Sequence, residues 1–171
     1  QAEFFHSKAG NMAGFAIAVD VEPTTGSRPG PAAAHACVAR LRQLYPRHPI
    51  IGYIPHWYWD DQSTRFVDLL WASNYVTGSG TPAQLYARVR PRQWAAYGGR
   101  SPALLQFTNA ATVPGVAGRV DCSAFRGTVR QLRAKLLPPK PPQPTPEDLM
   151  QPGLLLKGAG AVTPLAIPNG A

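Results

Sequence analysis

The sequence predicts an α/β fold in which strands of a parallel sheet alternate with helices. Two features of residues 1–137 support this class: five strand-like apolar runs recur along the chain, and amphipathic helical segments separate several of them. A third feature is the end of the first run, where apolar and small residues give way to two acids. Acids at the C-terminal end of a buried strand are typical of the active face of a (β/α) barrel.

One helix is predicted over residues 31–44, with Pro31 in its first turn, where proline is tolerated. Its apolar residues recur at spacings of three and four and form one stripe. The stripe contains Ala34, Cys37, Val38, Leu41 and Leu44. The predicted strands cover residues 15–22, 49–54, 69–75, 103–108 and 119–125, and further helices are expected near residues 82–89 and 127–136.

The clearest domain boundary follows residue 137, because six of the nine residues from 138 to 146 are proline. Such a composition favours an extended, semi-rigid linker, which we place over residues 138–152. Residues 153–171 are apolar and interrupted by glycine and proline, with two short strand-like runs. We interpret them as the start of a truncated, mostly β, C-terminal region; an unstructured tail is the alternative.

The formal net charge is +8, and residues 1–137 hold 15 Lys and Arg against 7 Asp and Glu. This excess favours an acidic polymer as partner, either nucleic acid or bacterial wall. The arginines are spread over several elements and no nucleic-acid motif is present, so we expect no nucleic-acid partner. No apolar run is long enough for a membrane helix, so no membrane partner is expected either. Cys37 and Cys122 could form one disulfide or be two buried thiols.

The first strand carries the candidate chemistry. Side chains alternate faces along a strand, so Asp20 and Glu22 project to the same side with Cα atoms roughly 7 Å apart. Pro23 then ends the pairing. Two carboxylates this close influence each other's pKa, and one is expected to hold its proton more tightly. Glycoside cleavage needs such a pair: an acid for the leaving oxygen and a carboxylate for the sugar cation. The alternative is a solvated strand end without chemistry.

Four segments carry a resemblance to a known family. They are QAEFF (1–5), AVDVEP (18–23), LLWASNYV (69–76) and LLQFTNAATVPGVAGRVDCSAFRG (104–127). In this order they resemble glycoside hydrolase family 25, the Chalaropsis-type lysozymes, which include phage endolysin-like muramidases. The first segment resembles the helix that precedes the family's Asp-x-Glu strand, and the second resembles that strand. The last segment resembles the family's closing strands, with Phe107 in place of a tyrosine.

The resemblance implies a modified, TIM-like (β/α) barrel and a retaining-type muramidase that hydrolyses the β-1,4 bond after N-acetylmuramic acid in peptidoglycan. Glu22 would be the general acid/base. Asp20 would stabilise the oxazolinium or cation, or orient the acetamido group of the substrate, and Asp121 would line the cleft. The family needs no metal or organic cofactor. A monomer that acts extracellularly, secreted or delivered by a phage to the wall, is implied as well.

The family's first strand carries a Gly-x-Asp-x-Ser motif, and nothing in residues 1–14 matches it. The barrel is therefore expected to be incomplete at its N-terminal side, without its first three strands. An open barrel has unpaired edges, which favours a second interpretation of the function. In that reading the chain is a non-catalytic cell-wall-binding or phage structural module with a degenerate or truncated hydrolase fold. A chitinase-like barrel is disfavoured because Ala18 stands where that fold has a further acid.

Four more residues are candidates for contact with a glycan. Sugars stack their C–H faces on aromatic rings, so Tyr53, Tyr75 and Trp71 could line the groove, and Gln106 could hydrogen-bond the substrate. Core or rim packing is the alternative for the aromatics. None of the four histidines has the spacing of a metal site, and only His56, near the aromatic cluster 57–59, is of interest. Asp60 and Asp61 are expected to cap a helix.

Overall fold

A computed structural model describes residues 1–59 and 62–139 of the chain, which belong to one compact unit, Gln1–Pro139. The expected linker at 138–152, beyond Pro139, and the expected C-terminal region at 153–171 lie outside the described residues. So do Asp60 and Asp61, whose expected capping role is therefore untested. Within the described ranges, no helix combines the length and apolar character that a bilayer crossing requires.

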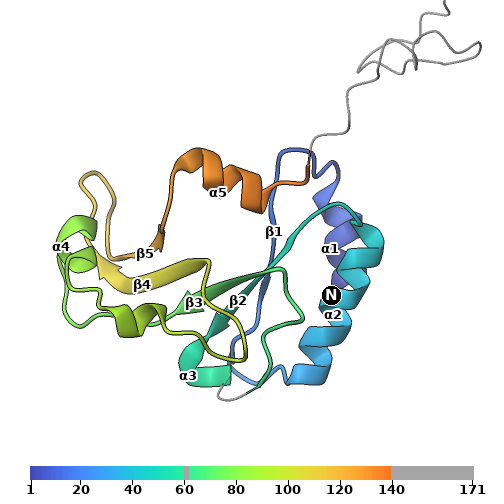
Figure 1. The fold of residues 1–171 in the computed structure, drawn as a ribbon, viewed down its shortest axis with the longest axis horizontal. Coiled ribbons are helices and arrows are strands. Elements are labelled where there is room, and N and C mark those ends of the chain that lie inside the picture. The colour runs from blue at the N-terminus through green and yellow to red at the C-terminus, as the bar shows by residue number, and fades with distance from the viewer. Residues whose placement is uncertain (60–61, 140–171) are drawn as a thin grey trace, which may run out of the picture. The chain divides into compact units, whose positions relative to one another are not determined.

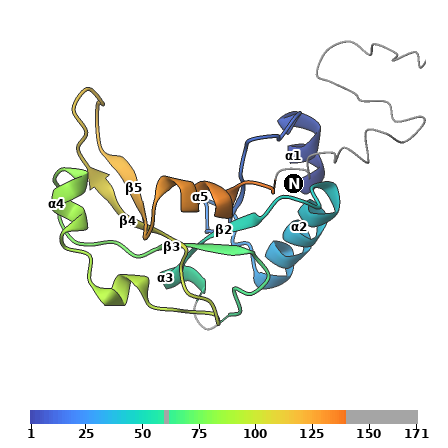
Figure 2. The same cartoon turned by 45° about the horizontal axis from the view of Figure 1, so that its top comes forward.

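A five-stranded sheet forms the centre of the unit, in the order β1-β2-β3-β4-β5. The strands are β1 (Ile17–Asp20), β2 (Ile50–Pro55), β3 (Leu69–Ser73), β4 (Leu104–Ala111) and β5 (Val120–Phe125). The sheet curls, as part of a barrel wall would (Figures 1 and 2). Among the described residues β1 pairs with β2 alone, so the sheet stays open on its other side. The expectation of an incomplete α/β barrel agrees with this architecture.

The expectation of a fully parallel sheet is wrong for the last pair. The strands from β1 to β4 are parallel, but β5 runs antiparallel to β4. A parallel return needs a crossover of a dozen or more residues, and only residues 112–119 join these two strands. Gly115, with φ +82°, lies in that connection and allows the chain to reverse.

The helices are short except for one. The predicted helix 31–44 is confirmed as α2 (Pro31–Leu44), and Ala34, Val38 and Leu41 of its stripe are buried. It packs beside α1 (Ala2–Ala9), as Figure 1 shows, and against β2. The remaining helical segments are α3 (His56–Trp59), α4 (Pro82–Tyr86), the 3-10 helix η1 (Pro91–Trp94) and α5 (Val129–Leu136). Helix α3 was not expected from the sequence.

The first strand is shorter than predicted. The Phe15 amide donates to the carbonyl of Met12 in a turn that contains Gly14 at φ +82°, so β1 starts only at Ile17. Phe15 is 63% exposed instead of packing under a helix. From Ile17 onward the predicted alternation is present: Ile17 and Val21 are buried, whereas Asp20 is exposed and Glu22 half-buried.

The core lies between the sheet and α2. Its fully buried side chains include Ile50 and Ile54 of β2, Val38 of α2 and Leu70 of β3. Each such side chain stabilises the fold by roughly 1.5–3 kcal/mol. Cys37 and Cys122 are both free and half-buried, so the disulfide alternative is not realised. This packing fixes the strand ends that carry the acids.

Candidate functional site

The register of the parallel strands gathers most of the candidate residues on one face. Asp20 is level with Tyr53, and Tyr53 is level with Trp71. Ser73 is level with Gln106, which pairs with Ser123 of β5. Paired residues point to the same side of a sheet, and so do residues two apart on one strand. Glu22 therefore joins Asp20, and Asp121 joins Ser123, on this shared face.

The two strand-end carboxylates differ in their surroundings. Loss of hydration raises the pKa of Asp20, although part of the side chain is exposed. The pKa of Glu22 is raised first by loss of hydration and then by repulsion from the charges of Asp20 and Asp121. More causes act to raise the pKa of Glu22 than that of Asp20. A raised pKa is what a general acid requires.

Asp121 lies at the second residue of β5 and is exposed. Its charge acts on Glu22 and also helps to raise the pKa of the Cys122 thiol, behind loss of hydration. Glu22, which follows β1, and Asp121, on β5, thus come from the two outer strands of the sheet. They are close enough for the charge of Asp121 to raise the pKa of Glu22. Sheet curvature is what brings these outer strands together.

A hydrogen-bond network in the middle of the face fixes Gln106. The hydroxyls of Tyr53 and Tyr75 both donate to Oε1 of Gln106, the second at 3.1 Å. Gln106 is 6% exposed and Tyr53 is half-buried, so these groups have little freedom. Loss of hydration raises the pKa of the Tyr53 phenol, and the nearby charge of Glu22 adds to the effect. The network holds a polar, neutral surface next to Glu22.

Trp71 serves this face mainly through packing. Its ring meets the ring of Tyr53 edge-on, with centroids 5.3 Å apart, and its indole N–H donates to Oγ of Ser123 at 3.1 Å. The N–H is therefore already bonded to the protein. Ser123 was missed from the sequence, although its position two residues after Asp121 places it on the same face.

A pocket of about 300 Å³ opens at the C-terminal ends of β2 and β3. It is lined by His56, Trp57, Ser73, Asn74 and Tyr75. The His56 ring stacks on the ring of Tyr97 at 4.4 Å, and the Tyr97 hydroxyl donates to the carbonyl of Ile54. Tyr97 lies in a turn after η1, and no sequence pattern pointed to it.

Asp20 lines a different pocket, of about 170 Å³, along the open edge of β1. This pocket shares no lining residue with the one beside Tyr75. The structure thus brings Asp20, Glu22, Asp121, Tyr53 and Gln106 onto one face, but one edge of β1 beside them has no partner strand among the described residues. Among the described residues, no group of three His, Cys, Asp or Glu side chains is arranged to hold a metal ion.

A solved structure with a similar fold is that of the bacterial lysozyme from Streptomyces coelicolor, at a TM-score of 0.54. The two chains are 16% identical, and the alignment covers 80% of this chain and 64% of the lysozyme chain. At this identity the likeness shows a shared fold, and this chain spans less than two thirds of the lysozyme's length. No protein-family model and no curated protein sequence matches the chain.

Proposed function

We propose that this chain is the acid-bearing part of a muramidase that hydrolyses the β-1,4 bonds of peptidoglycan, as the resemblance to glycoside hydrolase family 25 implies. One observation carries the proposal. Glu22, with a raised pKa, lies beside two further acids at the C-terminal end of strands that have the fold of a bacterial lysozyme. The reaction would take place at the wall, outside the producing cell, and the active species would be a monomer.

The proposed chemistry follows from the different tasks of the carboxyls. Protonated Glu22 gives its proton to the glycosidic oxygen, and the bond from the anomeric carbon to that oxygen breaks. Ionised Asp20 stabilises the positive charge left on the sugar, or orients the acetamido group that forms an oxazolinium with it. Water then adds at the anomeric carbon and returns its proton to Glu22. One water is consumed, and one new reducing end and one free hydroxyl are formed.

The residues around the acids would hold the sugar. The fixed amide of Gln106 offers a hydrogen-bonding group whose position is set by two tyrosines. Tyr75 is 40% exposed and Trp57 64% exposed, so their rings can present a flat surface to a glycan at the pocket beside β3. Asp121 would face the cleft from the opposite strand. Trp71 contributes by supporting Tyr53.

The test is the release of reducing ends from purified peptidoglycan by the chain and by its Glu22→Gln variant. We expect turnover to fall on the order of a thousandfold, because glutamine cannot donate the proton. Glu3→Gln is the matched control, since it makes the same chemical change on α1, where Glu3 pairs with Arg40. Undiminished turnover in the Glu22→Gln variant would reject Glu22 as the acid.

A second candidate function is wall binding without catalysis. The observation that favours it is the open edge of β1, which leaves Asp20 at the margin of the sheet. In this case the chain would sediment with insoluble peptidoglycan, no reducing ends would be released, and the Glu22→Gln variant would bind equally well.

A further inference from the structure

A second concave site lies at the opposite end of the strands. A pocket of about 550 Å³ is lined by the start of β3, the segment before β4, the end of β5 with the residue after it, and single residues of η1 and α5. Three of its lining residues are basic: Arg100, Arg126 and Lys135. They come from three separate segments of the chain. Asp68 is the single acid among the lining residues.

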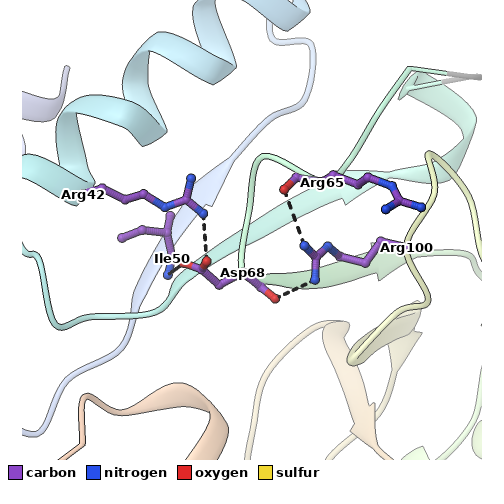
Figure 3. Close-up of polar contacts among 5 residues, drawn as sticks. All are labelled: Arg42, Ile50, Arg65, Asp68 and Arg100. Carbon is purple, nitrogen blue, oxygen red and sulfur yellow. Dashed lines mark hydrogen bonds and ion pairs between the residues drawn. The ribbon is translucent and has the colours of Figure 1, made fainter.

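Asp68 leaves the charge of Arg100 uncompensated. Figure 3 shows why: the Asp68 carboxylate accepts from Arg42 at 2.8 Å and from the backbone N–H of Ile50 at 2.8 Å. Arg100 reaches the main-chain carbonyl of Asp68 at 3.0 Å instead, and that of Arg65 at 3.4 Å. The carboxylate is thus directed away from the pocket's cations. Within the described residues, none of the three basic side chains forms an ion pair with a carboxylate.

Two of the cations are held in place before any ligand binds. The two carbonyls fix the guanidinium of Arg100. Its Nε is buried and has no hydrogen-bond partner in the described part of the chain. The guanidinium of Arg126 lies over the ring of Trp94, 4.4 Å from its centroid. Because these side chains are already ordered, binding an anion costs less side-chain entropy than at a free surface.

We propose that this pocket binds phosphate groups of a phosphodiester-linked, non-aromatic polymer of the bacterial wall. Guanidinium groups match the geometry of phosphate oxygens, and a concave site collects several donors around one anion. The choice of a wall polymer rests on the proposed function; the preference for a phosphate oxyanion rests on the pocket alone. Such a contact would anchor the chain to the wall that carries its glycan.

The same geometry disfavours nucleic acid as the ligand. Single strands are bound by exposed aromatic rings on which bases stack, but Trp94 is only 8% exposed and Arg126 covers its ring. Duplexes are bound by a basic stripe or a helix in a groove, whereas these three cations surround one pocket.

The pocket is also remote from the acids at the other end of the sheet. Strand β3 alone, from Leu69 to Ser73, spans roughly 13 Å.

The experiment uses the full chain and a soluble poly(glycerol phosphate) as probe, with affinity measured by titration calorimetry at about 50 mM salt. Arg126→Gln combined with Lys135→Gln should weaken binding on the order of tenfold or more, because two charge-assisted contacts are lost. Both residues are exposed, so the fold should be retained. The matched control combines Lys8→Gln with Arg47→Gln, which removes the same two charges from exposed positions outside the pocket and should leave affinity unchanged.

Three results would overturn the proposal. The chain could fail to bind the polymer, or both double variants could weaken binding equally, which would mean diffuse charge. DNA could also bind at least as tightly as the polymer and lose affinity in the pocket variant, which would make nucleic acid the ligand. The probe contains no glycosidic bond, so its binding is independent of whether Glu22 cleaves peptidoglycan.

Discussion

The two ends of the strands of one sheet have opposite electrostatic character. Two of the five acids in the described residues, Glu3 and Asp68, each pair with an arginine. The other three are Asp20, Glu22 and Asp121, which share the face at the C-terminal ends and have no such partner among the described residues. At the N-terminal ends the basic groups outnumber the acid. The net charge of +8 belongs to the chain as a whole. It therefore does not show that one end of the sheet is acidic and the other basic.

This difference accounts for the raised pKa of Glu22. An arginine beside a carboxyl lowers its pKa, and a neighbouring carboxylate raises it. At the acidic end only the second influence operates, together with loss of hydration. The proposed catalytic task thus depends on a Glu22 carboxyl that forms no ion pair among the described residues, while the proposed anchoring task depends on three basic side chains gathered at the other end.

After the loss of turnover expected for Glu22→Gln, the largest expected effect is on turnover in an Asp20→Asn variant. Asparagine keeps the shape but not the charge that would stabilise the sugar cation, so release of reducing ends should fall on the order of a hundredfold. Folding should be unaffected, because Asp20 is exposed and makes no ion pair among the described residues. The measurement pairs the turnover assay with urea unfolding. Loss of the native transition would instead identify Asp20 as structural.

The acidic end could be largely predicted from local sequence. Strand alternation places Asp20 and Glu22 together without reference to the rest of the chain. The stripe on residues 31–44 was equally local, and α2 has the predicted bounds. Asp121 was assigned to the cleft through the family resemblance, and Tyr53 and Gln106 were proposed only as possible glycan contacts, because strand order and register depend on distant segments.

The basic end could not be predicted. Arg100, Arg126 and Lys135 lie in three segments, and nothing in their spacing indicates that they converge. The antiparallel direction of β5 is part of the reason, since it returns residue 125 to the start of β4. Helix α3 was missed because its four residues, HWYW, carry no helical periodicity. The basic pocket, the direction of β5 and helix α3 therefore depend on tertiary packing, which a local sequence pattern does not reveal.

A smaller effect is expected on the pH dependence of turnover in an Asp121→Asn variant. The alkaline limb should report loss of the proton from Glu22. Removing the Asp121 charge removes one cause of the raised pKa of Glu22, so the limb should move to lower pH. The position of the limb is the readout, because Asp121 is also proposed to face the cleft and its loss could lower the rate itself.

The pocket variant Arg126→Gln with Lys135→Gln is the control for that shift. Its charges lie about a strand's length from Glu22, beyond the Debye length of roughly 8 Å at physiological ionic strength. The alkaline limb should therefore stay in place. Equal movement of the limb in both variants would show that net charge, and not the separation of the two ends, sets the pKa of Glu22.

The smallest expected effect is on the stability of the Glu22→Gln variant. The folded-state pKa of Glu22 is raised above the unfolded value of about 4.3. Folding therefore favours the protonated form, and stability is lost as pH rises from the unfolded pKa through the folded one. Glutamine cannot ionise, so the variant should be more stable than the parent at pH 7. The gain should vanish below about pH 4 and stay under about 1 kcal/mol, because the half-buried Glu22 side chain is still partly screened by solvent.

Urea unfolding at both pH values measures this gain, and Glu3→Gln is the control of opposite sign. Glu3 loses its ion pair with Arg40, so that variant should be no more stable than the parent at pH 7. Both variants make an already basic chain more positive, which by itself opposes folding. A gain at Glu22 alone must therefore arise locally, from relief of the repulsion and lost hydration at the acidic end. A gain in neither variant would mean that the acidic end is solvated well enough to ionise without cost.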